Sequence, residues 1–225
     1  MRQDDLKRAV GYRAARLIED DMVVGLGSGS TVYYLLEKMK ELIDGGMRIQ
    51  GIPSSERTAE WARHFGIPLT TFEQVEMVDL TIDGADEVDP NFQLIKGGGG
   101  SLVREKIVAS HSKKVYIIVD ETKLVSQLGA FYLPIEVVPF GWRATAGILE
   151  KLGLKWALRE REGEVFVSNN GNYILDCDAG VIERPSELHE RLKKITGVVE
   201  TGLFINLVDG VFVGTSDGVR FLERL

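Results

Sequence analysis

The chain is poor in residues that cross-link proteins or hold metals. Its 225 residues include one cysteine and three histidines. A single cysteine excludes an intramolecular disulfide, and Cys177 has no histidine or basic neighbour in sequence, so we interpret it as a small strand residue rather than a reactive thiol. His64, His111 and His189 lie in separate segments without the paired spacing of metal ligands. We therefore expect no protein-bound catalytic metal.

Long apolar runs and an excess of positive charge are also absent. The longest apolar runs are strand-sized, as at 115–119, and the N-terminal residues lack the apolar core of a signal peptide, so we expect no membrane span and a cytoplasmic location. A net charge of −7 argues against nucleic acid or an anionic membrane as the main partner. Hydrophobic residues make up 44% of the chain, which is enough to build a buried core.

Strand and helix patterns alternate through the first 130 residues. The predicted helices are 5–18, 31–42 and 54–65, and the predicted strands are 22–26, 48–52, 67–70, 78–83 and 114–119. This alternation predicts an α/β fold with a mostly parallel, doubly wound sheet. Such sheets bind ligands at the carboxyl ends of their strands.

The pattern changes near Pro134. The predicted order is strand 135–138, helix 142–152, strands 165–167 and 173–176, helix 186–195 and strand 198–205. Asn170-Gly171 between the two central strands is a strong hairpin signal. The β-α-β-β-α-β order resembles a ferredoxin-like α+β unit, and we expect residues 211–222 to return to the main sheet.

A first glycine-rich loop, Gly25-Leu-Gly27-Ser-Gly29-Ser30-Thr31, follows a predicted strand and opens a predicted helix. Ser30 stands where a dinucleotide fingerprint needs glycine, no acidic residue follows at the required distance, and the lysine of a Walker A loop is missing. We therefore reject NAD and ATP, expect no cofactor, and predict that a compact phosphate binds at the start of the helix. The alternative is a tight turn without a ligand.

A second loop contains four consecutive glycines between Lys96 and Ser101. Such a backbone needs either positive φ or close approach to a ligand. In the helix that follows, Val103 and Ile107 have i, i+4 spacing and predict the core-facing stripe. Glu105 lies about 200° around the helix from Val103 and should therefore face the cleft, where a carboxylate could transfer protons.

These polar residues are expected to gather at the carboxyl edge of the sheet. The set is Ser28, Gly29, Ser30, Thr31, Asp83, Asp86, Lys96, Gly97, Gly98, Gly99, Glu105 and Lys123. Lysines, hydroxyls and loop amides suit a phosphate, whereas three carboxylates suit hydroxyl recognition and proton transfer, so a small sugar phosphate fits both. Taken singly, Asp83 and Asp86 could cap turns and Lys123 could be solvated. Asp83, Asp86 and Glu87 could hold Mg²⁺ only with help from a substrate phosphate.

Four motifs in this order resemble the type A ribose-5-phosphate isomerase family, and the resemblance continues nearly end to end through residues 120–123, 170–172 and 197–204. The four motifs are Gly25-Leu-Gly-Ser-Gly-Ser-Thr31, Asp83-Gly-Ala-Asp-Glu87, Lys96-Gly-Gly-Gly99 and Arg104-Glu105-Lys106. The resemblance implies a Rossmann-like catalytic domain of residues 1–130 and 207–225 and a ferredoxin-like lid or oligomerisation domain of residues 131–206. It also implies a homodimer or homotetramer that interconverts ribose 5-phosphate and ribulose 5-phosphate without a metal.

The same resemblance assigns roles by position. Glu105 corresponds to the catalytic base, and Asp83, Asp86 and Lys96 would handle hydroxyl protons and the developing oxyanion of an enediol(ate) path. The substrate-binding segments would be Ser28, Gly29, Ser30, Thr31, Asp83, Gly84, Ala85, Asp86, Lys96, Gly97, Gly98, Gly99 and Lys123.

Two other functions are compatible with a similar fold. A sugar-phosphate-sensing domain of a transcription regulator would need a DNA-binding module, and about twenty residues before the first strand are too few for one. Acyl-CoA transfer would use a carboxylate as nucleophile. Incubation with ribose 5-phosphate separates these alternatives from an isomerase.

Overall fold

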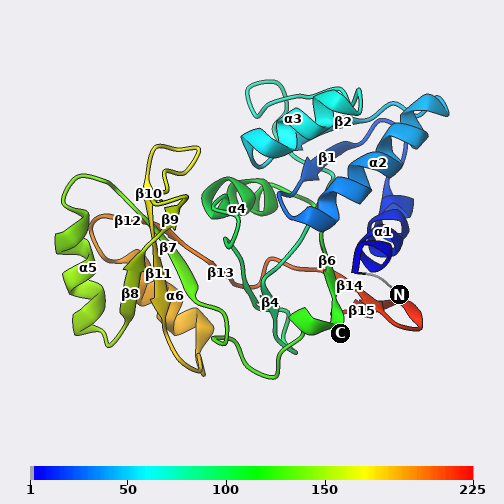
Figure 1. The fold of residues 1–225 in the computed structure, drawn as a ribbon. Coiled ribbons are helices and arrows are strands. Elements are labelled where there is room, and N and C mark those ends of the chain that lie inside the picture. The colour runs from blue at the N-terminus through cyan, green and yellow to red at the C-terminus, as the bar shows by residue number, and fades with distance from the viewer. Residues whose placement is uncertain (1–2, 225) are drawn as a thin grey trace. The chain divides into compact units, whose positions relative to one another are not determined.

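The computed structural model describes residues 3–224, which form two compact units (Figure 1). The first unit comprises the residues up to Ala85, Arg104–Leu124 and the segment from Leu207 onward, and the second comprises Asp86–Val103 and Val125–Asn206. These bounds differ from the expected domains 1–130 with 207–225 and 131–206, because residues 86–103 and 125–130 group with the second unit.

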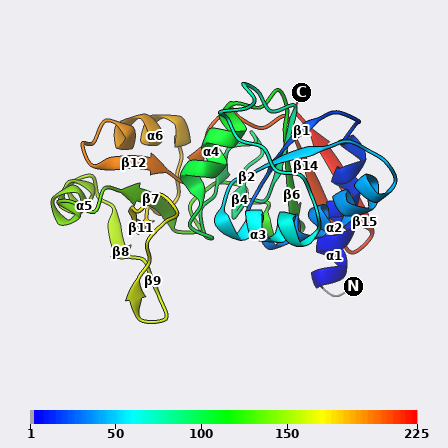
Figure 2. The same cartoon turned by 90° about the horizontal axis from the view of Figure 1, so that it is seen from above.

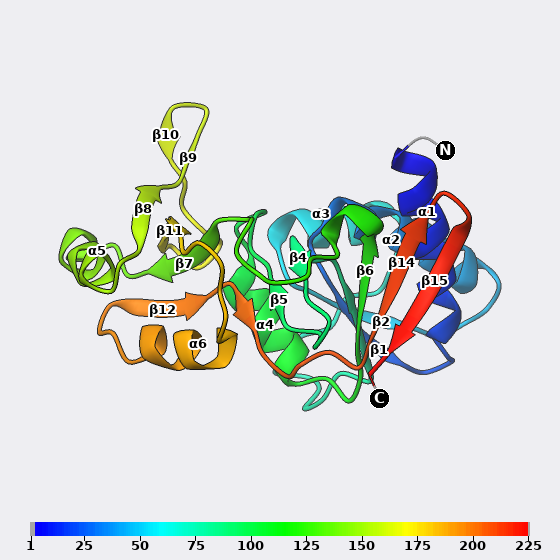
Figure 3. The same ribbon diagram turned by 90° about the horizontal axis from the view of Figure 1, so that it is seen from below.

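A mostly parallel sheet lies at the centre of the first unit. In the described chain its strand order is β15-β14-β6-β3-β1-β2. The bounds are β1 Val23–Leu26, β2 Gln50–Pro53, β3 Leu80–Asp83, β6 Val115–Asp120, β14 Gly210–Thr215 and β15 Gly218–Glu223. All neighbours are parallel except β14 and β15, which form a terminal hairpin (Figure 3). The expected parallel sheet and the return of residues 211–222 to it are confirmed.

Helices cover both faces of this sheet. They are α1 (Gln3–Ala14), α2 (Ser30–Asp44), α3 (Glu56–His64) and α4 (Leu102–Ser110), with short 3-10 turns at Ala15–Leu17 and Glu121–Lys123. Val24 and Leu26 of β1 pack in a core with α1 and α2, which lie side by side (Figure 1). Val23, on the opposite face of the same strand, packs against Val108 of α4. Because successive strand residues point to opposite faces, this burial confirms a doubly wound arrangement.

The second unit is built on an antiparallel sheet with the strand order β12-β7-β11-β8 (Figure 2). Its elements are β7 (Leu133–Val137), α5 (Trp142–Lys151), β8 (Lys155–Leu158), β11 (Tyr173–Asp178), α6 (Pro185–Lys193) and β12 (Val198–Thr201). Ala146 and Leu149 of α5 and Leu192 of α6 share one core with Ile135 and Leu175 of the sheet. This order and packing confirm the ferredoxin-like α+β unit.

Two smaller pieces complete the second unit. The strands β4 (Glu87–Val88), β5 (Leu94–Ile95) and β13 (Leu203–Phe204) pair in the order β13-β5-β4. The strands β9 (Glu160–Arg161) and β10 (Glu164–Val165) form a ribbon that projects from the main sheet of the unit (Figure 3).

Two strand predictions were wrong. The second strand of the ferredoxin-like order is β8, not 165–167, and the expected hairpin at Asn170-Gly171 reduces to one bridge between Val167 and Tyr173. Sequence patterning hides β8, because its residues alternate between exposed and half-buried and only pairing with β11 stabilises it. The expected strand 67–70 is a single bridge at Leu69, next to Pro68, which has no N–H to donate.

No helix among residues 3–224 is long and apolar enough to cross a membrane.

Candidate functional site

The loop after β1 is built around the carboxylate of Asp83, within the first unit. A Cβ on Gly27 would lie 2.0 Å from Asp83 Oδ1, so a side chain at this position is excluded. The backbone N–H of Ser28 donates to Asp83 Oδ1 at 3.1 Å, and the N–H of Gly84 donates to the same oxygen at 2.7 Å. Asp83 is only 3% exposed. A buried carboxylate at the carboxyl end of β3 is thus fixed by two backbone donors.

Glu105 lies in the first turn of α4 and is 5% exposed. It accepts a hydrogen bond from the hydroxyl of Ser28, so the loop after β1 and the start of α4 meet at this carboxylate. The predicted core stripe was wrong, because Ile107 is 45% exposed whereas Leu102, Glu105 and Val108 are buried. Val108 sets this face: it approaches Gly25 of β1, where a Cβ would lie 2.5 Å from its methyl group.

The carbonyl groups of the same loop are held by α3. Arg57 Nη2 donates to the carbonyl oxygen of Ser28 at 2.6 Å, and Thr58 Oγ1 donates to that of Gly27 at 2.8 Å. Gly29 is the N-cap of α2 and has no side chain with which to cap the first N–H groups of that helix. Sequence reasoning missed Arg57 and Thr58, because on their own they resemble ordinary residues of a short helix.

The other polar residues of the first unit occupy the ends of elements. Ser30 and Thr31 form the first turn of α2, with Ser30 exposed and Thr31 half-buried. Lys123 ends the 3-10 turn that follows β6. Asp120 caps this turn by accepting the backbone N–H of Thr122 at 3.0 Å. A helix N-terminus and a lysine therefore follow two of the parallel strands.

In the second unit the tetraglycine loop is tied to Asp86. The N–H of Gly98 donates to Asp86 Oδ2 at 2.8 Å. Gly97 and Gly100 have φ of +106° and +88°, so the predicted positive φ is confirmed at these two positions. Lys96 is 4% exposed, and its ammonium lies 5.3 Å from the ring centroid of Phe204.

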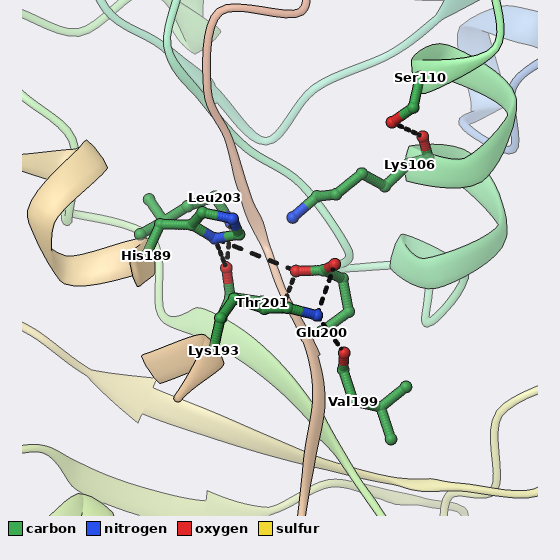
Figure 4. A network of polar contacts seen from close by, with 8 residues as sticks. All are labelled: Lys106, Ser110, His189, Lys193, Val199, Glu200, Thr201 and Leu203. Carbon is green, nitrogen blue, oxygen red and sulfur yellow. Dashed lines mark hydrogen bonds and ion pairs between the residues drawn. The ribbon is translucent and has the colours of Figure 1, made fainter. Parts of the chain in front are cut away.

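The backbone of Lys96 is anchored by the turn that follows β12. The N–H of Lys96 donates to the carbonyl oxygen of Gly202 at 2.9 Å. On the preceding residue, Thr201 Oγ1 lies 2.8 Å from His189 Nδ1 of α6 and accepts the N–H of Leu203 at 3.3 Å (Figure 4). His189 therefore serves this turn, and among residues 3–224 no three His, Cys, Asp or Glu side chains are grouped to hold a metal.

The predicted site residues fall into two groups, one in each unit. Ser28, Gly29, Ser30, Thr31, Asp83, Gly84, Ala85, Glu105 and Lys123 belong to the first unit, and Asp86, Lys96, Gly97, Gly98 and Gly99 belong to the second. Direct contacts join Ser28 to Asp83 and to Glu105 in the first group, and Asp86 to Gly98 in the second. The peptide bond between Ala85 and Asp86 connects the two groups in the chain.

Comparison with known proteins gives one consistent result. The family described as ribose 5-phosphate isomerase A (phosphoriboisomerase A) matches residues 50–218. Ribose-5-phosphate isomerase A 1 of Oceanobacillus iheyensis is 53% identical over 96% of this chain and 97% of its own length.

Solved structures agree with this result. A D-ribose-5-phosphate isomerase in complex with phospho-erythronic acid is 39% identical, with a TM-score of 0.96 and 100% of both chains covered. The ribose 5-phosphate isomerase of Plasmodium falciparum is 42% identical, with a TM-score of 0.95, and covers 98% of this chain and 99% of its own.

Proposed function

Because the chain belongs to the ribose 5-phosphate isomerase A family, we propose that Glu105 is the base that moves a proton between C1 and C2 of the substrate. The activity is the interconversion of ribose 5-phosphate and ribulose 5-phosphate in the non-oxidative pentose phosphate pathway. The observation that carries the assignment is the buried Glu105 carboxylate, bonded to the hydroxyl of Ser28 in the glycine-rich loop.

The proposed reaction proceeds through an enediolate. Glu105 takes the proton from C2 of the open-chain aldose, the C2 electron pair forms the C1–C2 double bond, and the negative charge moves to O1. Glu105 then returns the proton to C1, the O2 proton passes to O1, and O2 becomes the carbonyl oxygen of the ketose. Glu105 lies in the first turn of α4, and its burial slows the exchange of the abstracted proton with water.

The reaction also needs groups that transfer the protons of the substrate hydroxyls and that stabilise the negative oxygen of the enediolate. We assign these tasks to Asp83, Asp86 and Lys96. Lys96 supplies a buried positive charge where negative charge develops, which is the arrangement that lowers the energy of an enediolate. Two backbone donors hold Asp83 and one holds Asp86, so each carboxylate is an oriented group.

The phosphate is proposed to bind at the start of α2. Gly29 leaves the first N–H groups of this helix without a side-chain cap, and Ser28, Ser30 and Thr31 add hydroxyls. Lys123 contributes a positive charge, and the backbones of Gly84, Ala85, Gly97, Gly98 and Gly99 contact the sugar. The solved relative with phospho-erythronic acid supports a pocket for a four-carbon acid that carries a phosphate.

Three further properties remain proposals. They are independence from metals, assembly into a homodimer or homotetramer, and a role for the second unit as lid or oligomerisation domain. Sedimentation of the pure protein tests the assembly, because a monomer would contradict it.

Isotope labelling tests the proton-transfer path. Run in D2O, the reaction should place deuterium on C1 of the ketose, since a base that holds the proton can exchange it with solvent. C2-deuterated substrate should give a primary isotope effect and lose part of its label to H2O. Full intramolecular retention of the C2 label over many turnovers would favour a hydride shift, and the turnover of Glu105→Gln then decides between this shift and a base in a sealed pocket.

A further inference from the structure

Within the second unit, the side chain of Arg159 bonds the backbone of the tetraglycine loop. It follows β8, and its side chain is only 11% exposed. Arg159 Nη1 donates to the carbonyl oxygen of Gly97 at 2.7 Å and lies 3.3 Å from that of Gly98. Its Nε donates to Asp176 Oδ2 at 2.9 Å, and Nη2 donates to Oδ1. The planar guanidinium thus bonds a carboxylate on one side and the loop on the other.

This contact determines where the amide groups of the loop point. In a trans peptide the carbonyl and the following N–H point in opposite directions. With the carbonyl of Gly97 held by Arg159, the N–H of Gly98 points the other way, where it donates to Asp86 Oδ2 at 2.8 Å. A chain of hydrogen bonds therefore runs from Asp176 through Arg159 and one peptide unit to Asp86.

The backbone of the tetraglycine loop needs contacts from outside the loop, because the loop has no side chains that could fix its conformation. Four glycines have no side chains with which to pack and have the widest choice of backbone angles. The ring of Phe166 fills the place of a Gly100 side chain, since a Cβ there would lie 2.3 Å from the ring. The N–H of Phe166 donates to the carbonyl oxygen of Arg159 at 2.9 Å, so the ring and the guanidinium come from one anchored segment.

We propose that Arg159, fixed by Asp176, is a positioning residue of the isomerase: it sets the orientation of the Gly98 and Gly99 amides and, through Gly98, that of the Asp86 carboxylate. The proposal rests on the proposed function, in which this loop and Asp86 contact the substrate. Lysine cannot replace the arginine, because one ammonium group cannot bond both oxygens of Asp176 and the carbonyls of the loop in the same plane.

Arg159→Met, Arg159→Lys and a control, Arg161→Met, test the proposal. Arg161 lies on the same segment with its guanidinium 4.7 Å from the centroid of the Phe166 ring, so the control removes an arginine beside the same aromatic side chain. We expect kcat/KM for ribose 5-phosphate to fall by about 10²-fold in Arg159→Met, as for a misplacement of roughly 1 Å. Arg159→Lys should recover less than about a tenth of the lost activity, and Arg161→Met should stay within about threefold of wild type.

Two readouts separate positioning from loss of folding. Methylguanidinium added to Arg159→Ala should restore part of kcat, whereas the same salt should leave Arg161→Ala unchanged. In amide spectra, the Gly98 and Gly99 signals of Arg159→Met should move and the Gly98 N–H should exchange faster with solvent, while circular dichroism stays that of the wild type.

The outcomes are distinct. Wild-type activity in Arg159→Met, or full recovery in Arg159→Lys, would overturn the proposal. Phospho-erythronic acid added to the wild type should shift the Gly98 and Gly99 signals. If it does not, the loop is not at the substrate and the proposed site fails, even where Arg159→Met still changes the amide signals of the loop.

Discussion

Gly27→Ala is the substitution whose effect follows most directly from the structure. The added Cβ would lie 2.0 Å from Asp83 Oδ1 and 2.6 Å from Asp83 Cα, whereas real Cβ atoms essentially never come within 3.0 Å of another heavy atom. The loop and Asp83 must therefore separate by about 1 Å or more, and because backbone is involved, no side-chain rotation relieves the overlap.

Such a separation breaks the contacts that order the site. The bond from the Ser28 N–H to Asp83 joins the loop to this carboxylate and is worth about 1.5–3 kcal/mol, so we expect the free energy of unfolding to fall by about this amount or more. Displacing Ser28 also moves its hydroxyl away from Glu105. We expect kcat/KM for ribose 5-phosphate to fall by about 10²-fold or more in the fraction that folds.

The assay measures ketose formation by protein that thermal melting shows to be folded. Gly29→Ala is the matched control for stability, since its Cβ would meet only Gly84 Cα at 3.8 Å and its φ of −74° suits alanine. Its free energy of unfolding should stay within about 1 kcal/mol of wild type. If Gly27→Ala keeps kcat/KM within about twofold of wild type, the inferred coupling of Gly27, Asp83 and Glu105 is refuted.

Three further predictions concern substrate, metal and pH. Free ribose should be a far worse substrate than ribose 5-phosphate in kcat as well as KM, because remote phosphate binding contributes to the transition state; equal kcat/KM for both sugars would exclude the phosphate pocket. Exhaustive chelation should leave activity intact, and a loss reversed by a divalent ion would instead indicate a metal-assisted hydride shift. Burial, with a smaller effect of Asp176, raises the pKa of the Cys177 thiol from 9.0 to about 12. The folded protein therefore favours the neutral thiol, so the contribution of Cys177 to stability is complete below pH 9 and is lost as the pH rises toward 12. Iodoacetamide should label Cys177 only after unfolding. Rapid labelling of the native protein at pH 8 would contradict this prediction.

The sequence predicts best those strands and helices whose hydrophobic pattern does not depend on the elements that pack against them. The apolar strands at 23–26 and 115–120 are buried on both faces and read as continuous hydrophobic runs. The strand β8 has no such run, because its residues alternate between exposed and half-buried, so only pairing with β11 defines it. The short helix α4 offers two possible apolar stripes, and the close approach of Val108 to Gly25 decides between them.

The residues of the candidate site likewise divide into those that local sequence features indicate and those that only tertiary contacts identify. Glycine spacing and the position of acidic residues after strands are local features, and they indicate Asp83, Glu105 and both loops from the sequence alone. Arg57 and Arg159 could not be found in this way. Their partners, Ser28 and the Gly97 carbonyl, are distant in sequence, and no local periodicity distinguishes these arginines from surface residues.

The central claim, that Glu105 carries the proton between the two carbons, is tested most directly by the turnover of Glu105→Gln. The amide oxygen can still accept the Ser28 hydroxyl, so the loop and the binding of phospho-erythronic acid should be retained, whereas an amide cannot take the C2 proton. We expect kcat to fall by about 10³-fold or more while the Kd for phospho-erythronic acid changes by less than about fivefold. A variant that binds this ligand and keeps more than about a tenth of the wild-type kcat would contradict the assignment of Glu105 as the base.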